Sequence, residues 1–190
     1  MGFDLGRAEE AVAAWLATAT GLPCRDDDTA SVVSRIIPKF AQTPNLPMPY
    51  LTYLVPPPLS TGREEQRKVF DPNQPEGLEV QVTSIFRGEL TVTVNVYTER
   101  ARGGPDADGF LSAGGYIHRV QQHLGLQSVR DQLRCAGLVL IDRGTPRDFS
   151  SLAGAVGQGR AVLEVRFRVT DTIAEGEGYI STVNPTVTAS

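Results

Sequence analysis

Residues 78–97 read LEVQVTSIFRGELTVTVNVY, and this stretch decides the fold. Successive side chains of a β-strand point to opposite faces, so an apolar residue at every second position gives a strand one apolar face. A two-residue turn at Arg87-Gly88 would put the two halves of that set on opposite faces. The pattern therefore predicts one long strand bent at Gly88, or two strands joined by a three-residue turn. The even-numbered apolar residues are Leu78, Val80, Val82, Phe86, Leu90, Val92, Val94 and Val96.

A second long strand is predicted near the end of the chain. Ala161, Leu163, Val165, Phe167 and Val169 alternate with polar and charged residues. The charged positions Glu164, Arg166 and Arg168 then share one face, which has two interpretations. They can form cross-strand ion pairs on a solvated surface, or they can belong to a subunit interface or a channel-facing surface.

The remaining elements are shorter. Asp4 is a predicted helix N-cap. Apolar residues from Leu5 to Ala19 recur at three- and four-residue spacing, which predicts a helix that ends at Gly21. Trp15 of this helix should lie in the core. Further helices are expected at 108–124 and 128–134, and strands at 31–37, 50–55, 138–141 and 179–183, of which the strand at 138–141 should be buried. Gly114 and Gly115, in the middle of 108–124, indicate close packing on a sheet or a bend. The order predicts an α+β domain, with a mainly antiparallel sheet flanked by two or three helices.

A proline-rich region interrupts this order, since residues 38–75 hold nine of the 13 prolines. Pro56-Pro57-Pro58 should be a stiff polyproline stem. We expect residues 56–77 to form a long projecting loop. Loops of this length are usually functional. It carries the charged Arg63 and Arg67 and an apolar pair, Val69 and Phe70. We expect Phe70 to anchor the loop on a neighbouring subunit or an adjacent ring. Residues 1–183 would then form a single domain and residues 184–190 a tail.

Composition disfavours several classes of protein but does not identify the function. The chain has 190 residues and a formal net charge of −4, whereas a generic nucleic-acid binder is more often strongly basic. No apolar stretch approaches the roughly 20 residues that span a bilayer, and the N-terminus lacks a signal-peptide pattern. Cys24 and Cys135 are expected to be reduced and buried.

Signals of catalysis or metal binding are weak. His118 and His123 are five residues apart and diverge by roughly 140° on a helix, so they cannot form a paired zinc face. The Asp26-Asp27-Asp28 run lacks the glycine and distal glutamate of a calcium loop. The glycines at 154–159 precede a strand, the wrong order for a dinucleotide site. We therefore predict no catalytic residue, no metal and no cofactor, and we expect the protein not to be an enzyme.

Several segments together carry a family resemblance, over nearly the whole chain. They are the N-terminal helix, then LPMPYLTY at 46–53, GELTVTVNVY at 88–97, GLVL at 137–140, DFSSL at 148–152 and GRAVLEVRFRV at 159–169. In this order and spacing they resemble the neck or tail terminator proteins of tailed bacteriophages. Two positions depart from the family pattern: Thr98 stands where a glycine is usual, and Gly159 where many relatives have an acidic residue.

The resemblance implies a structural virion protein that assembles as a ring, usually a homo-hexamer. The ring would end growth of the tail tube and offer a surface to the head-side connector or stopper protein. Genomic DNA would pass through the lumen without specific binding, and no membrane would be involved. The protein would be assembled in the host cytoplasm and reside in the virion neck. Alternatives are a head-completion or tail-tube protein and, less favoured, a small soluble enzyme. The candidate interface residues are Arg63, Arg67, Val69, Phe70, Glu164, Arg166 and Arg168.

Overall fold

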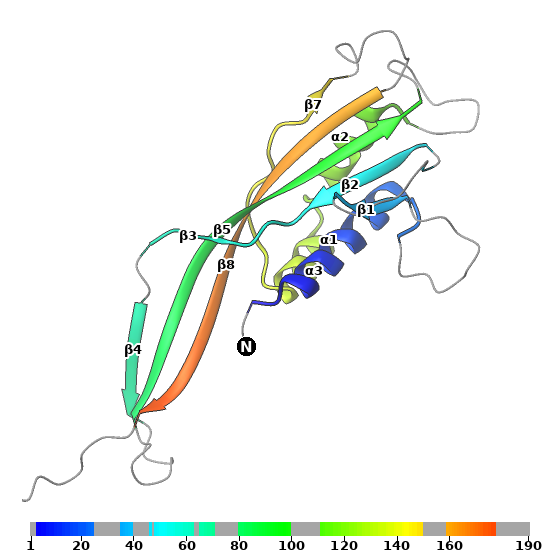
Figure 1. Cartoon of the computed structure of the whole chain (residues 1–190). Helices are drawn as coiled ribbons and strands as arrows, with labels where there is room; N and C mark the ends of the chain where they lie inside the picture. Colours follow the sequence, from blue (N-terminus) through cyan, green and yellow to red (C-terminus); the bar gives the residue numbers. More distant parts are fainter. Residues whose placement is uncertain are drawn as a thin grey trace, which may run out of the picture.

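The computed structural model describes residues 3–24, 35–39, 46, 48–62, 65–70, 80–99, 111–149 and 159–177. Within these ranges the chain is α+β with one mostly antiparallel sheet, as predicted (Figure 1). The helices are α1 (Leu5–Thr20), α2 (Ala113–His123) and α3 (Gln127–Cys135). The strands are β1 (Ile36–Pro38), β2 (Tyr50–Leu54), β3 (Leu59–Ser60), β4 (Glu65–Phe70), β5 (Val80–Thr98), β6 (Val139–Asp142), β7 (Arg147–Asp148) and β8 (Gly159–Glu177).

Two long strands form the spine of the sheet. β5 and β8 pair antiparallel along their whole lengths, from Val80 opposite Glu177 to Thr98 opposite Gly159. The first of the two sequence alternatives is therefore correct: residues 80–98 are one strand, with no turn at Gly88. A Cβ atom at Gly88 would lie 3.1 Å from the carbonyl oxygen of Leu59. Glycine at this position lets β3 approach β5 closely.

Short strands line both outer sides of this spine. The main order is β1-β2-β5-β8-β6, and β2, β4 and β3 pair with separate parts of β5. On the other side, β6 and β7 pair with β8. Only β1 and β2 run parallel among these pairs.

The spine extends well beyond the helices, which divides the molecule into a body and an arm (Figure 1). The body contains residues 88–98 of β5 and 159–169 of β8, together with the helices. The arm contains β4, residues 80–87 of β5 and residues 170–177 of β8. At about 3.3 Å per residue, the arm is about 25 Å long.

The core lies on one face of the body. Leu90, Val92, Val94 and Val96 stand directly opposite apolar residues of β8, and these pairs are almost fully buried. The helices cover this face (Figure 1), and Trp15 of α1 is fully buried, as predicted. The Asp4 carboxylate caps α1 by accepting hydrogen bonds from the amides of Gly6 and Arg7. In the described ranges, no helix lies on the opposite face of the sheet.

Several expectations need correction. Residues 59–60 and 65–70 were expected in a loop, but they form β3 and β4 because β5 offers them a free edge to pair with. β6 was expected to be buried, yet Val139 is 46% exposed, since β6 is the last strand of its edge. Cys135 is exposed and Cys24 half-buried. Helix α2 begins at Ala113, later than expected. The strand expected at 179–183 and the boundary at 183 lie outside the described residues.

Candidate functional site

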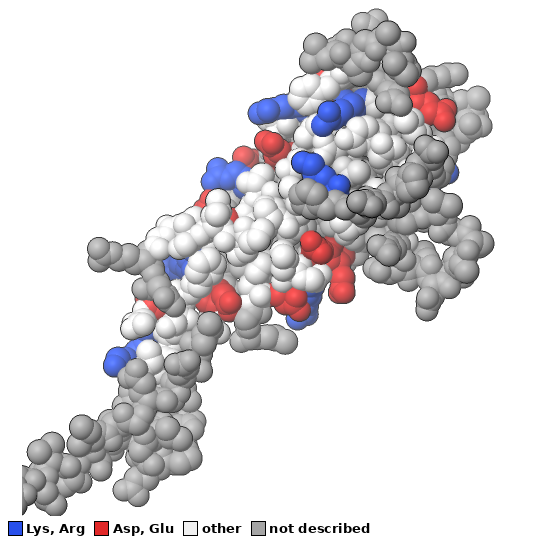
Figure 2. All heavy atoms as spheres, in the orientation of Figure 1, with Lys and Arg blue, Asp and Glu red and all other residues white. Residues whose placement is uncertain are grey.

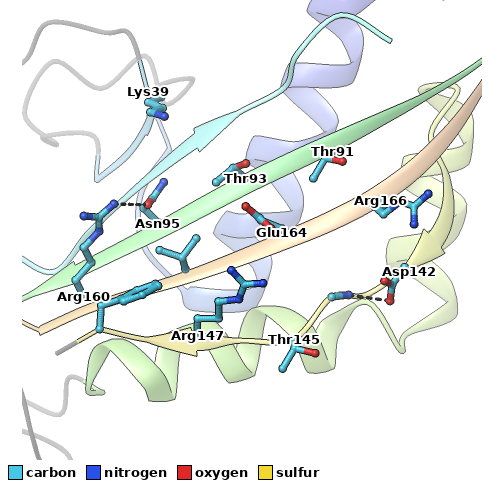
Figure 3. A pocket seen from close by; sticks show the side chains of 13 residues that line it. Lys39, Thr91, Thr93, Asn95, Asp142, Thr145, Arg147, Arg160, Glu164 and Arg166 are labelled. Carbon is cyan, nitrogen blue, oxygen red and sulfur yellow. Dashed lines mark hydrogen bonds between the residues drawn. The ribbon is translucent and has the colours of Figure 1, made fainter. Parts of the chain in front are cut away.

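The face of the sheet without helices is hollowed into a trough of about 560 Å³ (Figure 3). Its floor is made by the outward side chains of β5 and β8. One wall is Lys39, directly after β1, and the other is the segment 142–149 around β7. In Figure 3 the helices lie behind the sheet, on the side away from the trough. The floor residues are Thr91, Thr93, Asn95, Arg160, Val162, Glu164 and Arg166.

The wall at 142–149 lies close to β8 because of one glycine. Gly144 has φ +65°, and a Cβ there would overlap the carbonyl oxygen of Glu164. The amide of Gly144 donates to the Asp142 carboxylate at 3.1 Å, and its carbonyl accepts from the Gln121 side chain of α2 at 2.6 Å. These contacts fix the wall against both the sheet and the helical layer.

Ion pairs occupy the end of the trough nearest the arm. The Glu89 carboxylate of β5 lies 2.8 Å from Arg166 and 3.6 Å from Arg168. The hydrogen bond that Arg166 donates, together with the charges of both arginines, lowers the pKa of Glu89. The cross-strand ion pairs that the sequence allowed are therefore present, and both arginine side chains stay more than half exposed.

Three other charges of the trough are not neutralised in this way. Glu164 on the floor lies between Lys39 on one wall and Arg147 on the other (Figure 3). All three side chains are exposed. In the part of the chain that the structure describes, no ion pair or side-chain hydrogen bond joins any of them. In addition to its other charged residues, the trough therefore has one anionic and two cationic groups that no described residue pairs with.

An aromatic pair lies at the far end of the trough from the arm. Tyr50 stacks on Tyr97 with ring centroids 4.8 Å apart. The Arg160 guanidinium lies 5.6 Å from the Tyr97 centroid and donates to the Asn95 side chain at 3.2 Å. Burial raises the pKa of Tyr50. The sequence of β8 alone does not reveal this contact, because Tyr97 lies opposite Arg160 on the neighbouring strand.

The arm presents a different surface. Arg67 is exposed in the middle of β4, and Phe70 at the far end is 61% exposed. At the base of the arm, Glu65 pairs with Arg87 at 2.9 Å. The predicted residues therefore fall into two groups, with Glu164, Arg166 and Arg168 on the trough face and Arg67 and Phe70 on the arm. Val69 lies in β4, and Arg63 is outside the described residues.

Among the described residues, no three His, Cys, Asp or Glu side chains gather as metal ligands would. None of the helices described is both long and apolar enough to cross a membrane.

Comparison with known proteins gives the family. No curated protein matches the sequence. A family model described as phage neck terminator protein matches residues 9–190. The match covers most of α1, the whole described sheet and the other two described helices. The chain therefore belongs to the phage neck terminator protein family, whose members are structural components of the virion tail and neck.

Proposed function

We propose that this protein forms a ring at the head-proximal end of a phage tail, where it ends growth of the tail tube. The observation that carries the proposal is the separation of two surfaces on one subunit. The body carries the charged trough, and the exposed arm extends away from it (Figure 1). Two different surfaces on one subunit allow head-to-tail contacts between copies, and such contacts give a closed ring when the rotation between copies closes.

The ring contact should use the residues that the sequence singled out. Glu164, Arg166 and Arg168 line or border the trough, and Arg67 and Phe70 lie on the arm. Arg63 and Val69 belong to the same contact in this proposal. A homo-hexamer is the ring size that we expect.

The partners of the ring are the tail tube on one side and the head-side connector or stopper on the other. Genomic DNA passes through the lumen without specific binding. Acidic and basic side chains are interspersed over the face seen in Figure 2, and the described part of that face has no wide area of one sign. An overall charge of −4 per subunit disfavours tight attachment of DNA. The ring is assembled in the host cytoplasm and stays in the virion neck.

Electron microscopy of the purified protein tests this function. Single rings of uniform diameter are expected. Long stacked tubes would instead identify a tail-tube protein. Rings that bind head connectors but not tail tubes would identify a head-completion protein. A protein that stays monomeric at every concentration and salt condition contradicts the proposal.

A charge reversal in the trough sharpens the test. Arg166→Glu places a second carboxylate beside Glu89, where the native ion pair is 2.8 Å long. We expect fewer rings at equal protein concentration and an unchanged circular dichroism spectrum. Arg119→Glu, on the exposed side of α2, is the matched control because it makes the same charge change away from the trough. Equal ring yields from both variants would remove the trough from the interface.

A further inference from the structure

We propose that the trough of one copy receives the arm of a second copy, with Arg67 of the arm against Glu164 of the trough. This inference rests on the proposed ring and names the contact that holds it together. It joins two groups of residues that lie apart on a single subunit.

The charge pattern of the trough limits what can occupy it. Glu164 lies between Lys39 and Arg147, and the described residues provide none of the three with an ion pair. An occupant that covered Glu164 without bringing a cation would leave its carboxylate desolvated and uncompensated, which is strongly unfavourable. The occupant must therefore bring a cation to Glu164.

The arm carries an exposed cation and an exposed aromatic ring. Arg67 is exposed in β4, and within the described part of the chain it has no ion pair. Phe70 follows three residues later, 61% exposed at the far end of the strand. The trough has two half-buried apolar residues, Phe149 and Val162, that can cover such a ring. The arm thus supplies both the cation and the apolar group that fit the trough.

At the edge of the arm, β4 is the outermost described strand, paired only with β5. Alternate side chains of a strand point to opposite faces, so Arg67 and Phe70 lie on opposite faces of β4. An arm that enters edge first would press both faces of β4 against the trough. This geometry lets Arg67 reach the floor while Phe70 packs on the wall.

The distance between the arm and the trough of one subunit requires the occupant to be another copy. Phe70 pairs with Val80 at one end of β5, whereas the trough begins at Thr91 and continues toward the other end. From Val80 to Thr93 the strand covers about 43 Å at the usual rise per residue. Because β5 and β8 are continuous across this distance, the arm cannot fold back into its own trough. The same contact, repeated from copy to copy, gives the head-to-tail arrangement that closes a ring.

A charge exchange tests the pair directly in the full-length protein. Glu164→Arg and Arg67→Glu should each reduce the assembly constant at least about tenfold, measured by analytical ultracentrifugation, because each brings like charges together. The combined variant should recover most of the loss. The control combination, Glu164→Arg with Arg119→Glu, has the same net charge and should not recover it. A combined variant no better than the single variants overturns the arm-in-trough contact.

A second experiment does not depend on charge. Phe70→Cys and Val162→Cys are made separately in chains whose native cysteines are serine, and the two proteins are mixed and oxidised. Disulfide-linked dimers containing one of each chain are expected. Arg119→Cys replaces Val162→Cys in the control mixture and should give few linked dimers. Equal linkage in the two mixtures contradicts the contact.

The outcomes also separate this inference from the proposed function. If the Glu164→Arg and Arg67→Glu variants form rings as well as the wild type does, the arm-in-trough contact is wrong but the proposed ring stands. Absence of wild-type rings overturns both. If Lys39→Glu weakens binding of a short DNA duplex while the oligomeric state is unchanged, the trough holds phosphates and the proposed occupant is wrong.

Discussion

Gly144 is the residue on which the shape of the trough depends most directly. Its φ of +65° and the overlap that a Cβ would have with the Glu164 carbonyl exclude a side chain there. We expect Gly144→Ala to lower the free energy of unfolding by at least about 1 kcal/mol, measured in denaturant, because native backbone and side chain become incompatible.

Gly114→Ala is its matched control. A Cβ at Gly114 would contact only the end of the Asp148 side chain, which can move. Alanine also favours a helix interior by about 1 kcal/mol over glycine. This variant should therefore be as stable as the wild type or more so. Equal destabilisation by both substitutions would show that the wall does not lie against β8 as described.

The ion pairs of Glu89 should make the free energy of unfolding depend on pH. Its pKa is lowered by Arg166 and Arg168 from the ordinary value of 4.5, so its ion pairs stabilise the fold at neutral pH. That contribution is lost as the pH falls below 4.5 and through the lowered pKa. The difference in unfolding free energy between wild type and Glu89→Gln should thus shrink from pH 7 to pH 3. Glu10→Gln on α1 controls for loss of one charge, and a constant difference at Glu89 would contradict the assignment.

The arm is the element whose behaviour should change most on assembly. Trypsin cleaves after Arg67 and Lys68, both exposed on an edge strand in the isolated subunit. If the arm is covered by a neighbour, cleavage there should slow markedly in assembled rings. Cleavage after Arg119 on α2 provides the internal reference. Equal rates at Arg67 in monomers and rings would place the arm outside the interface.

The long strands could be predicted from sequence, and the short ones only in part. Within these strands, residues 90–96 and 161–169 alternate so regularly that one apolar set could be assigned to the core. β4 has the sequence EQRKVF, which carries no such alternation. Its strand conformation comes from backbone pairing with β5, which local composition does not reveal.

The trough could not be predicted at all. Lys39, Thr93, Arg147 and Glu164 come from four segments of the chain, and only the register of the sheet brings them together. The sequence did single out Glu164, because it shares a face with Arg166 and Arg168. It gave no signal for Lys39 or Arg147, whose importance depends on where β1 and β7 end.

At the scale of the whole molecule, we expect assembly to depend on surface complementarity and on no reactive side chain. His118→Ala and Cys135→Ser change exposed residues of α2 and α3, away from the trough and the arm. Ring yield and particle infectivity should match the wild type. Normal particles that are not infectious would reveal an active role for one of these side chains.

The register of β5 and β8 also sets an order in which the molecule can fold. Thr98 pairs with Gly159, and Val80 pairs with Glu177, so the chain separation between partners grows steadily from the body to the arm. Pairing that closes the shorter loop first loses less chain entropy, so the strands should zip from the body outward. The arm is then completed last. In pulse-labelling hydrogen exchange, amides of residues 90–96 should gain protection before those of residues 80–86. A subunit whose body has not folded would have no arm to offer, so only finished subunits would join a ring.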